Sequence, residues 1–131
     1  MSEQNTKNKV FINEHDVIEV NVIGDQTAES VTKMCDETDV LIAKQRDSDK
    51  SPLVLDSLAD VGKVPYNARR VVVDRIRALN YDKLAFVSND TIIRFGSNLI
   101  MQAIGRGNSV KHFESYEQAI TWLTADRDTK R

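Results

Sequence analysis

Arginines and small polar side chains follow two of the apolar runs in this sequence, and together they could bind an anion. The seven candidate ligand-binding residues are Asp56, Asn67, Arg69 and Arg70 after the first run, and Ser88, Thr91 and Arg94 after the second. Unpaired N–H groups and the helix dipole favour negative charge at the start of a helix. Arginine adds a donor fork that fits phosphate or carboxylate. The arginines would act as charge partners, and Asn67, Ser88 and Thr91 as neutral donors.

The same residue types also have a purely structural interpretation. Asn, Asp, Ser and Thr cap helices without contacting any ligand, and an arginine in a first helical turn is commonly solvated. Asp56, at the end of a strand, could equally bond the backbone of the next loop. Both interpretations remain open from the sequence alone.

No arrangement of residues predicts catalysis. Asp56 could be a phosphoacceptor as in receiver domains, but His15, Asp16 and Lys111 are poor substitutes for the acidic pair and lysine that such domains need. An enzyme acting on an anionic small molecule would need a general base, and Asp56 and Asp90 are the only candidates after these strands. The sequence therefore favours a protein that is not an enzyme.

Metal and cofactor sites are also not expected. The two histidines, His15 and His112, are far apart in the sequence, and Cys35 is the only cysteine, so a zinc site is improbable. The five glycines do not fall into either phosphate-binding glycine pattern. Cys35 lies at an apolar position of an expected helix, which predicts a buried structural thiol in a reducing compartment.

Composition predicts one ordinary globular domain. The chain has 131 residues, a formal net charge of −2 and 29% charged residues, which does not favour nucleic-acid binding. Its longest apolar runs are far shorter than the roughly 20 residues of a membrane span. The polar start lacks a signal-peptide core, so a cytoplasmic protein is expected. We expect flexible tails at 1–9 and 125–131 around a domain at 10–124.

The elements that must position the candidate site alternate between strands and helices. Strands are expected at 10–12, 17–23, 53–56, 83–88 and 109–113, and helices at 27–45, at 65–80, between Thr91 and Gly105, and around Ala119–Leu123. The order β-β-α-β-α-β-α-β-α predicts the α/β class, with a single-layer mixed, mostly parallel sheet flanked by helices. Right-handed crossovers would place the loops after the strands along one edge of that sheet.

Several of these segments resemble the SpoIIAA-like proteins of the STAS superfamily. The resemblance rests on the strand 53–56 with the helix starting near 67–69, the strand 83–87, and the closing pattern Phe113-x-Ser115-x-Glu117-x-Ala119-Ile120-x-Trp122-Leu123. It covers about residues 10–124. It implies a STAS-like fold, akin also to CRAL-TRIO lipid-carrier domains, and a non-catalytic binding role.

The resemblance also implies a departure from the phosphoswitch of anti-sigma-factor antagonists. In those proteins a serine at the start of the helix after this strand is phosphorylated by a partner kinase. Aligning the strand and the helix places Pro65-Tyr66-Asn67-Ala68 on their Asp-Ser-Ser-Gly sequence. The acceptor position then falls on Asn67, which cannot be phosphorylated, and Ser57 comes too early in the chain.

Our expectation is a regulatory or binding domain that recognises a protein partner or a small anionic or amphipathic, lipid-like ligand at the two helix starts. The alternative is a partner-switch component that works without phosphorylation. Self-association into a homodimer, through a sheet edge or the last helix, is compatible with the sequence.

Overall fold

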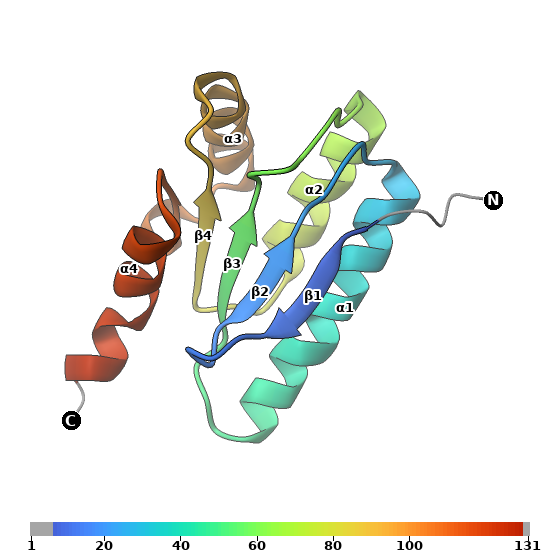
Figure 1. The fold of residues 1–131 in the computed structure, drawn as a ribbon. Helices are drawn as coiled ribbons and strands as arrows, with labels where there is room; N and C mark the ends of the chain where they lie inside the picture. The colour runs from blue at the N-terminus through green and yellow to red at the C-terminus, as the bar shows by residue number, and fades with distance from the viewer. Residues whose placement is uncertain (1–6, 130–131) are drawn as a thin grey trace.

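The computed structural model describes residues 7–129, and these alternate between strands and helices as expected (Figure 1). The elements are β1 (Lys9–Ile12), β2 (Ile18–Asn21), α1 (Ala28–Asp47), β3 (Leu53–Ser57), α2 (Tyr66–Ala78), β4 (Lys83–Val87), α3 (Thr91–Ile104), β5 (Val110–Phe113) and α4 (Tyr116–Thr129). A short 3-10 turn at Gly107–Ser109 precedes β5. The α4 helix continues past residue 124, where we placed the end of the domain. Most of the expected N-terminal tail, residues 1–6, lies outside the described residues.

The strands form one five-stranded sheet in the order β1-β2-β3-β4-β5. The β1–β2 pair is antiparallel and every other pair is parallel, which confirms the mixed, mostly parallel α/β sheet. In this register Val20, Asp56 and Phe86 lie side by side on adjacent strands. Because neighbouring residues at equivalent pleats point to the same face, these three side chains share one side of the sheet.

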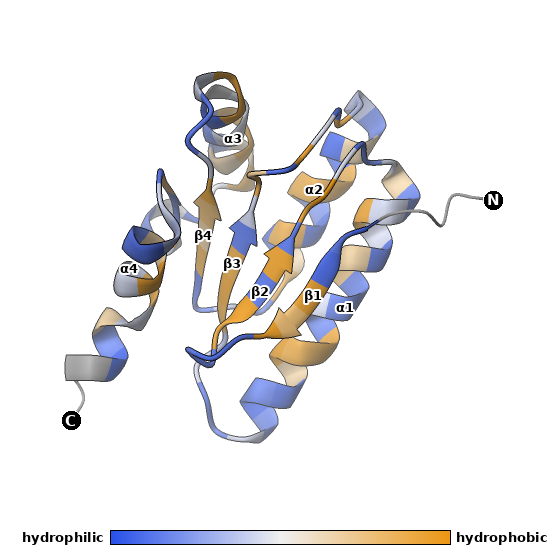
Figure 2. Ribbon diagram, in the orientation of Figure 1, coloured by the Kyte–Doolittle hydropathy of each residue, from blue (hydrophilic) through white to orange (hydrophobic). Residues whose placement is uncertain are grey.

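The two faces of the sheet have separate apolar cores. The face carrying Val20, Val54 and Phe86 packs against α1, α2 and α3. The opposite face, which includes Leu55 and Val87, packs against α4. Figure 2 shows hydrophobic strands between the helices, with β3 becoming hydrophilic only at its carboxyl end. A sheet covered on both faces explains why its central strands are apolar at nearly every position.

Capping side chains fix the starts of two helices on the three-helix face. Thr27 and Ser30 form a reciprocal capping box at α1. Asp90 accepts hydrogen bonds from the N–H groups of Ile92 and Ile93 at the start of α3. The α2 helix begins after Pro65 without a side-chain cap.

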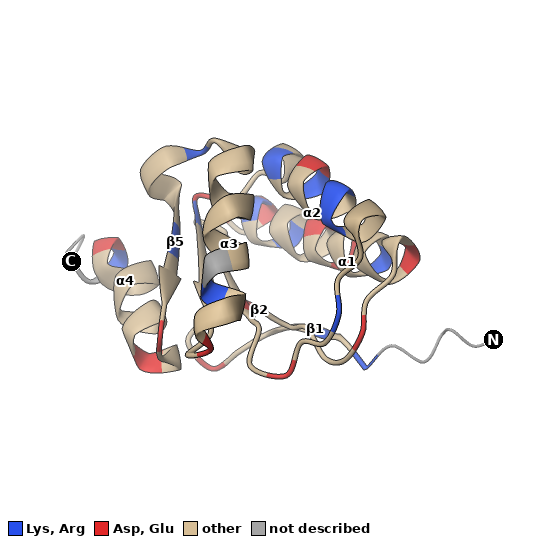
Figure 3. Cartoon of the chain, turned by 90° about the horizontal axis from the view of Figure 1, so that it is seen from above, with Lys and Arg blue, Asp and Glu red and all other residues tan. Residues whose placement is uncertain are grey.

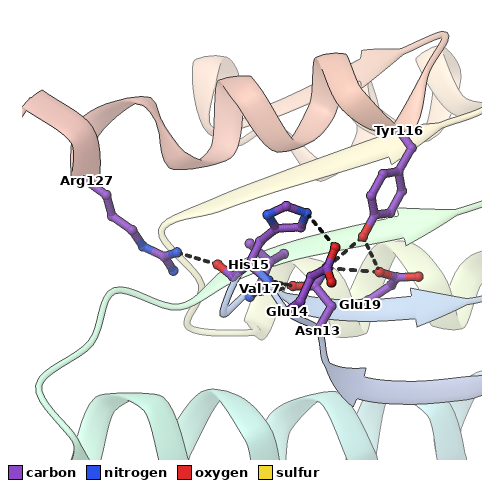
Figure 4. Close-up of polar contacts among 7 residues, drawn as sticks. All are labelled: Asn13, Glu14, His15, Val17, Glu19, Tyr116 and Arg127. Carbon is purple, nitrogen blue, oxygen red and sulfur yellow. Dashed lines mark hydrogen bonds and ion pairs between the residues drawn. The ribbon is translucent and has the colours of Figure 1, made fainter.

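Polar contacts fasten the β1–β2 hairpin to α4 on the other face (Figure 4). The Tyr116 hydroxyl donates to Glu19 Oε1 at 2.8 Å and accepts from Asn13 Nδ2 at 3.0 Å. Arg127 donates to the backbone oxygens of His15 and Asp16. Leu123 of α4 is 1% exposed. The last helix therefore packs into the core of this face of the sheet.

Replacing Tyr116 with phenylalanine should remove these hydroxyl contacts and keep the ring. We expect the free energy of unfolding to fall by about 1–2 kcal/mol, because two hydrogen bonds are lost at a partly exposed site. Urea unfolding of Tyr116→Phe beside the parent protein measures the loss. A double variant with Glu19→Ala should show less than the sum of the two single losses, since each change removes the bond between Tyr116 and Glu19; full additivity would contradict the contact.

Candidate functional site

A cavity of about 430 Å³ lies between the sheet and the three helices that cover it. Its walls are mostly apolar and come from every layer of this half of the molecule: Val20 and Phe86 of the sheet, Met34 of α1, Val72 and Ile76 of α2, and Ile93 and Ile100 of α3. The volume falls within the roughly 300–1,000 Å³ range of small-molecule pockets. The central feature of this face is therefore an apolar cavity.

Small residues on α3 keep the cavity open. Ile93, Gly96, Ser97 and Ile100 recur at helical spacing and all line it. A Cβ atom placed on Gly96 would meet nothing within 4 Å. The α3 helix packs mainly on α2 and β5.

Asp56 is the one acidic side chain in the cavity wall. It is 8% exposed and lies between Val20 and Phe86 in the sheet register. Among the described residues its carboxyl group has no hydrogen-bond partner. Burial without a compensating charge raises its pKa from 3.8 to about 7. The cavity therefore combines mostly apolar walls with a carboxyl group that no described residue hydrogen-bonds.

The outer wall of the cavity is the loop between β3 and α2, which is held by the loop between β2 and α1. Gly62 N donates to Gly24 O at 2.8 Å, and Gly24 N donates to Asp60 O at 2.9 Å. The Asp25 carboxylate accepts from Lys63 N at 2.8 Å. This pairing continues the β2–β3 ladder beyond the sheet and holds Gly62 and its neighbours against the cavity.

Gly62→Ala should destabilise this wall. A Cβ atom there would lie 2.9 Å from the backbone of Asp25 and closer still to its carboxylate, so the two loops must separate. We expect a loss of about 1–3 kcal/mol in unfolding free energy, measured by thermal and urea denaturation. Gly96→Ala is the matched control, because its Cβ enters open space. Equal effects at the two glycines would contradict the loop pairing.

Two of the seven residues predicted from the sequence line the cavity: Asp56 and Arg69. Arg69 is exposed at the rim, where its Nε donates to Val64 O at 3.0 Å. Asn67 and Arg70 are exposed in the same first turn of α2, and Arg70 contacts the Tyr66 hydroxyl at 3.5 Å. In Figure 3 several segments of α2 have the colour of Lys and Arg, whereas most of α3 has the colour of uncharged residues.

The other three predicted residues lie at the start of α3 and do not line the cavity. Ser88 is buried and its Oγ accepts from Asp90 N. Thr91 is exposed, and Arg94 forms an ion pair with Glu114 at 2.8 Å. Since Asp90 already caps this helix, the first N–H groups of α3 are not free for an anion in the way we expected from the sequence.

Sequence reasoning missed the cavity itself. The signal lay in α3, where Gly96 and Ser97 interrupt an otherwise apolar face in the middle of the helix. A glycine inside a helix costs about 1 kcal/mol relative to alanine, so its presence favours a reason in packing or function. Cys35 also lines the cavity and is buried, as predicted. Burial raises the pKa of its thiol to about 12.

Other kinds of site find no support in the described part of the chain. Residues 7–129 contain no group of three His, Cys, Asp or Glu side chains that could hold a metal ion. None of the helices within that range is both long and apolar enough to cross a membrane.

Comparisons with known proteins agree with this architecture. The sequence model of the SpoIIAA-like family matches residues 17–124. A crystal structure of an uncharacterized protein from Shewanella loihica PV-4, of the DUF3478 family and with a SpoIIAA-like fold, superposes with a TM-score of 0.62 at 14% sequence identity. The alignment covers 94% of this chain and 98% of that one. No curated protein matches this sequence. With the fold and most of its length accounted for in this way, the chain belongs to the SpoIIAA-like family.

Proposed function

We propose that this protein is a non-enzymatic regulatory domain that works by binding a small amphipathic ligand in the cavity beneath α2 and α3. The observation that carries the proposal is the open apolar cavity of about 430 Å³ at the carboxyl end of β3. An apolar space of this size loses packing contacts unless something occupies it. A ligand would restore those contacts and thereby stabilise one arrangement of α3 over others.

The rim of the cavity is more polar than its interior. Arg69 lies at the mouth, and the first turn of α2 carries N–H groups without a side-chain cap. Deeper in the cavity the walls are mostly apolar, and Asp56 is the acidic side chain among the few polar ones. A small, purely ionic ligand such as free phosphate fits this distribution poorly, since burying its charge against apolar walls is costly.

Binding is better supported than catalysis. Asp56 has the raised pKa of a general base, yet among the described residues that line the cavity Arg69 and Cys35 are the only other side chains that titrate. The Cys35 thiol is held neutral and Arg69 is exposed at the rim. No acid–base pair or activated nucleophile is thus assembled around the carboxyl group.

Titration with N-phenyl-1-naphthylamine, a neutral apolar dye, tests the proposal. We expect one dye molecule per chain to bind with enhanced fluorescence and to be displaced by decyl compounds. Ile100→Glu should weaken binding at least tenfold, because it places a carboxylate in the cavity wall. Val40→Glu is the matched control, as Val40 is 65% exposed on α1. Equal dye binding by the two variants would refute the proposal.

A second candidate is a protein-binding component of a partner switch that does not need phosphorylation. Its support is the set of exposed apolar residues on the two helices at the cavity mouth: Tyr66 is 68%, Ile92 82% and Leu99 52% exposed. Ile92 and Leu99 also line the cavity, so a partner seated there would close it. Arg69, Arg70 and Arg94 would then serve as charge partners for acidic side chains.

Native mass spectrometry of the protein purified gently from its host distinguishes the two candidates. A protein partner should be lost when Arg69→Ala and Arg94→Ala are combined and kept when Lys33→Ala and Lys44→Ala are combined on the exposed side of α1. A small bound molecule should survive both double variants. If both double variants lose a protein partner, or if neither does, an interface at the starts of α2 and α3 is contradicted.

A further inference from the structure

We infer that the ligand of this cavity carries its polar end inward as a cationic amine, which pairs with Asp56 while an aliphatic body fills the apolar space. This inference rests on the proposed function and adds the chemical class of the ligand. It stands on the geometry of the cavity and on the charges that line it.

The position of Asp56 is the first observation. The side chain is more than nine-tenths buried, lines the cavity, and has no hydrogen-bond partner among the described residues. Its nearest neighbours in the sheet are Val20 and Phe86, which offer no donor. A buried carboxylate left in this state is costly, and a donor that reaches it recovers that cost.

The second observation concerns the other polar and charged side chains that line the cavity. On α1 the polar lining residues are Cys35 and Thr38, and the Thr38 hydroxyl already donates to Met34 O. Gln26 is engaged by Asn8, Ser30 and the backbone of its own loop. On α3 the polar lining residue is Ser97, and on α2 it is Arg69 at the exposed rim. Among the described residues that line the cavity the only cationic side chain is Arg69, at the exposed rim, so an ionised Asp56 has no counterion in the cavity unless a ligand supplies one.

The choice between charge types follows from these observations. A carboxylate headgroup beside Asp56 would place two negative charges in an apolar space, and a hydroxyl would donate one bond without neutralising the charge. A primary amine, with a pKa close to that of a lysine side chain at about 10.4, stays cationic at pH 8 and donates three hydrogens. The amine is therefore the headgroup that fits best.

The experiment compares decylamine, decanol and decanoate by calorimetric titration at pH 8, below their micelle concentrations. We expect decylamine to bind at least tenfold more tightly than decanol, and decanoate to bind weakest. Asp56→Leu should abolish the preference for the amine while still binding decanol, whereas Asp60→Asn, an exposed change in the next loop, should leave the ranking intact. Decylamine affinity should also rise between pH 5 and pH 8, as Asp56 ionises.

The possible outcomes separate the two proposals. If none of the three compounds binds, the cavity is not a ligand site and both proposals fail. If decanoate or decanol binds as tightly as decylamine, or if Asp56→Leu keeps the amine preference, the cavity proposal stands and the cationic headgroup is refuted.

Discussion

Asp56→Leu should make this protein more stable at pH 8 by about 4 kcal/mol, an unusual direction for a change to a buried residue. In the folded chain the carboxyl group titrates near pH 7, against 3.8 in an exposed setting. Each pKa unit between the two states corresponds to about 1.36 kcal/mol. Leucine has a similar branched shape and places apolar atoms where the cavity wall is already apolar, so the penalty disappears.

The sign of the pH dependence follows from which state holds the proton. Between about pH 4 and pH 7 the folded carboxyl group is protonated and the unfolded one is not, so folding takes up a proton. The contribution of Asp56 to stability therefore falls as the pH rises through this range, and is constant above it. Below pH 4 both states are protonated and the leucine variant should gain little.

Urea unfolding of the parent protein and Asp56→Leu from pH 4 to pH 8 measures this difference. The gap between the two curves should open across that range and then level off. Asp60→Asn, which changes an exposed carboxylate in the loop after β3, should keep the pH dependence of the parent. A constant gap, or a leucine variant less stable at pH 8, would show that Asp56 has a partner that compensates its charge.

Gly96→Leu should abolish ligand binding while strengthening the fold. Gly96 faces the cavity from the middle of α3, and open space lies beyond its Cα atom. A leucine there would occupy part of the volume that a ligand needs, so we expect dye and decylamine affinity to fall at least tenfold. Replacing a helical glycine with a better helix former also adds about 1 kcal/mol of stability, before any gain from filling the cavity.

Gly96→Ala separates these two effects. Alanine gives most of the helix stabilisation and adds only a methyl group, so it should raise the unfolding free energy and keep binding within a few-fold of the parent. On the same samples, thermal unfolding measures the change in stability and dye titration measures the change in affinity. A leucine variant that binds normally would place the ligand elsewhere, and one that loses stability would mean that α3 packs more tightly than the cavity indicates.

The order of elements could be predicted because each apolar run has a clear period and clear ends. The strand at Leu53–Ser57 is apolar on both faces, which indicates a sheet covered on both sides, and α4 on one face with three helices on the other provides that cover. The helix between Thr91 and Gly105 could be placed because local chemistry favours its ends: Asp90 caps its start, and Gly105 ends it in a left-handed conformation.

The candidate site was harder to predict because it depends on distances between helices. The sequence placed Asp56 at the end of its strand, yet the burial of that side chain depends on α2, α3 and the neighbouring strands. The sequence also suggested Arg94 as a charge partner for a ligand, and it gave no sign of the ion pair with Glu114, twenty positions along the chain. Cavities arise from side chains that are missing, and a single small residue such as Gly96 is a weak signal in sequence.

Methyl NMR of the protein titrated with decylamine tests the central claim most directly. If the cavity between the sheet, α2 and α3 is the binding site, the methyl resonances of Val72, Ile93 and Ile100 should shift together and saturate at one equivalent, while those of Leu55, Ile120 and Leu123 on the α4 face should stay in place. Shifts confined to the α4 face, or none at all, would contradict it.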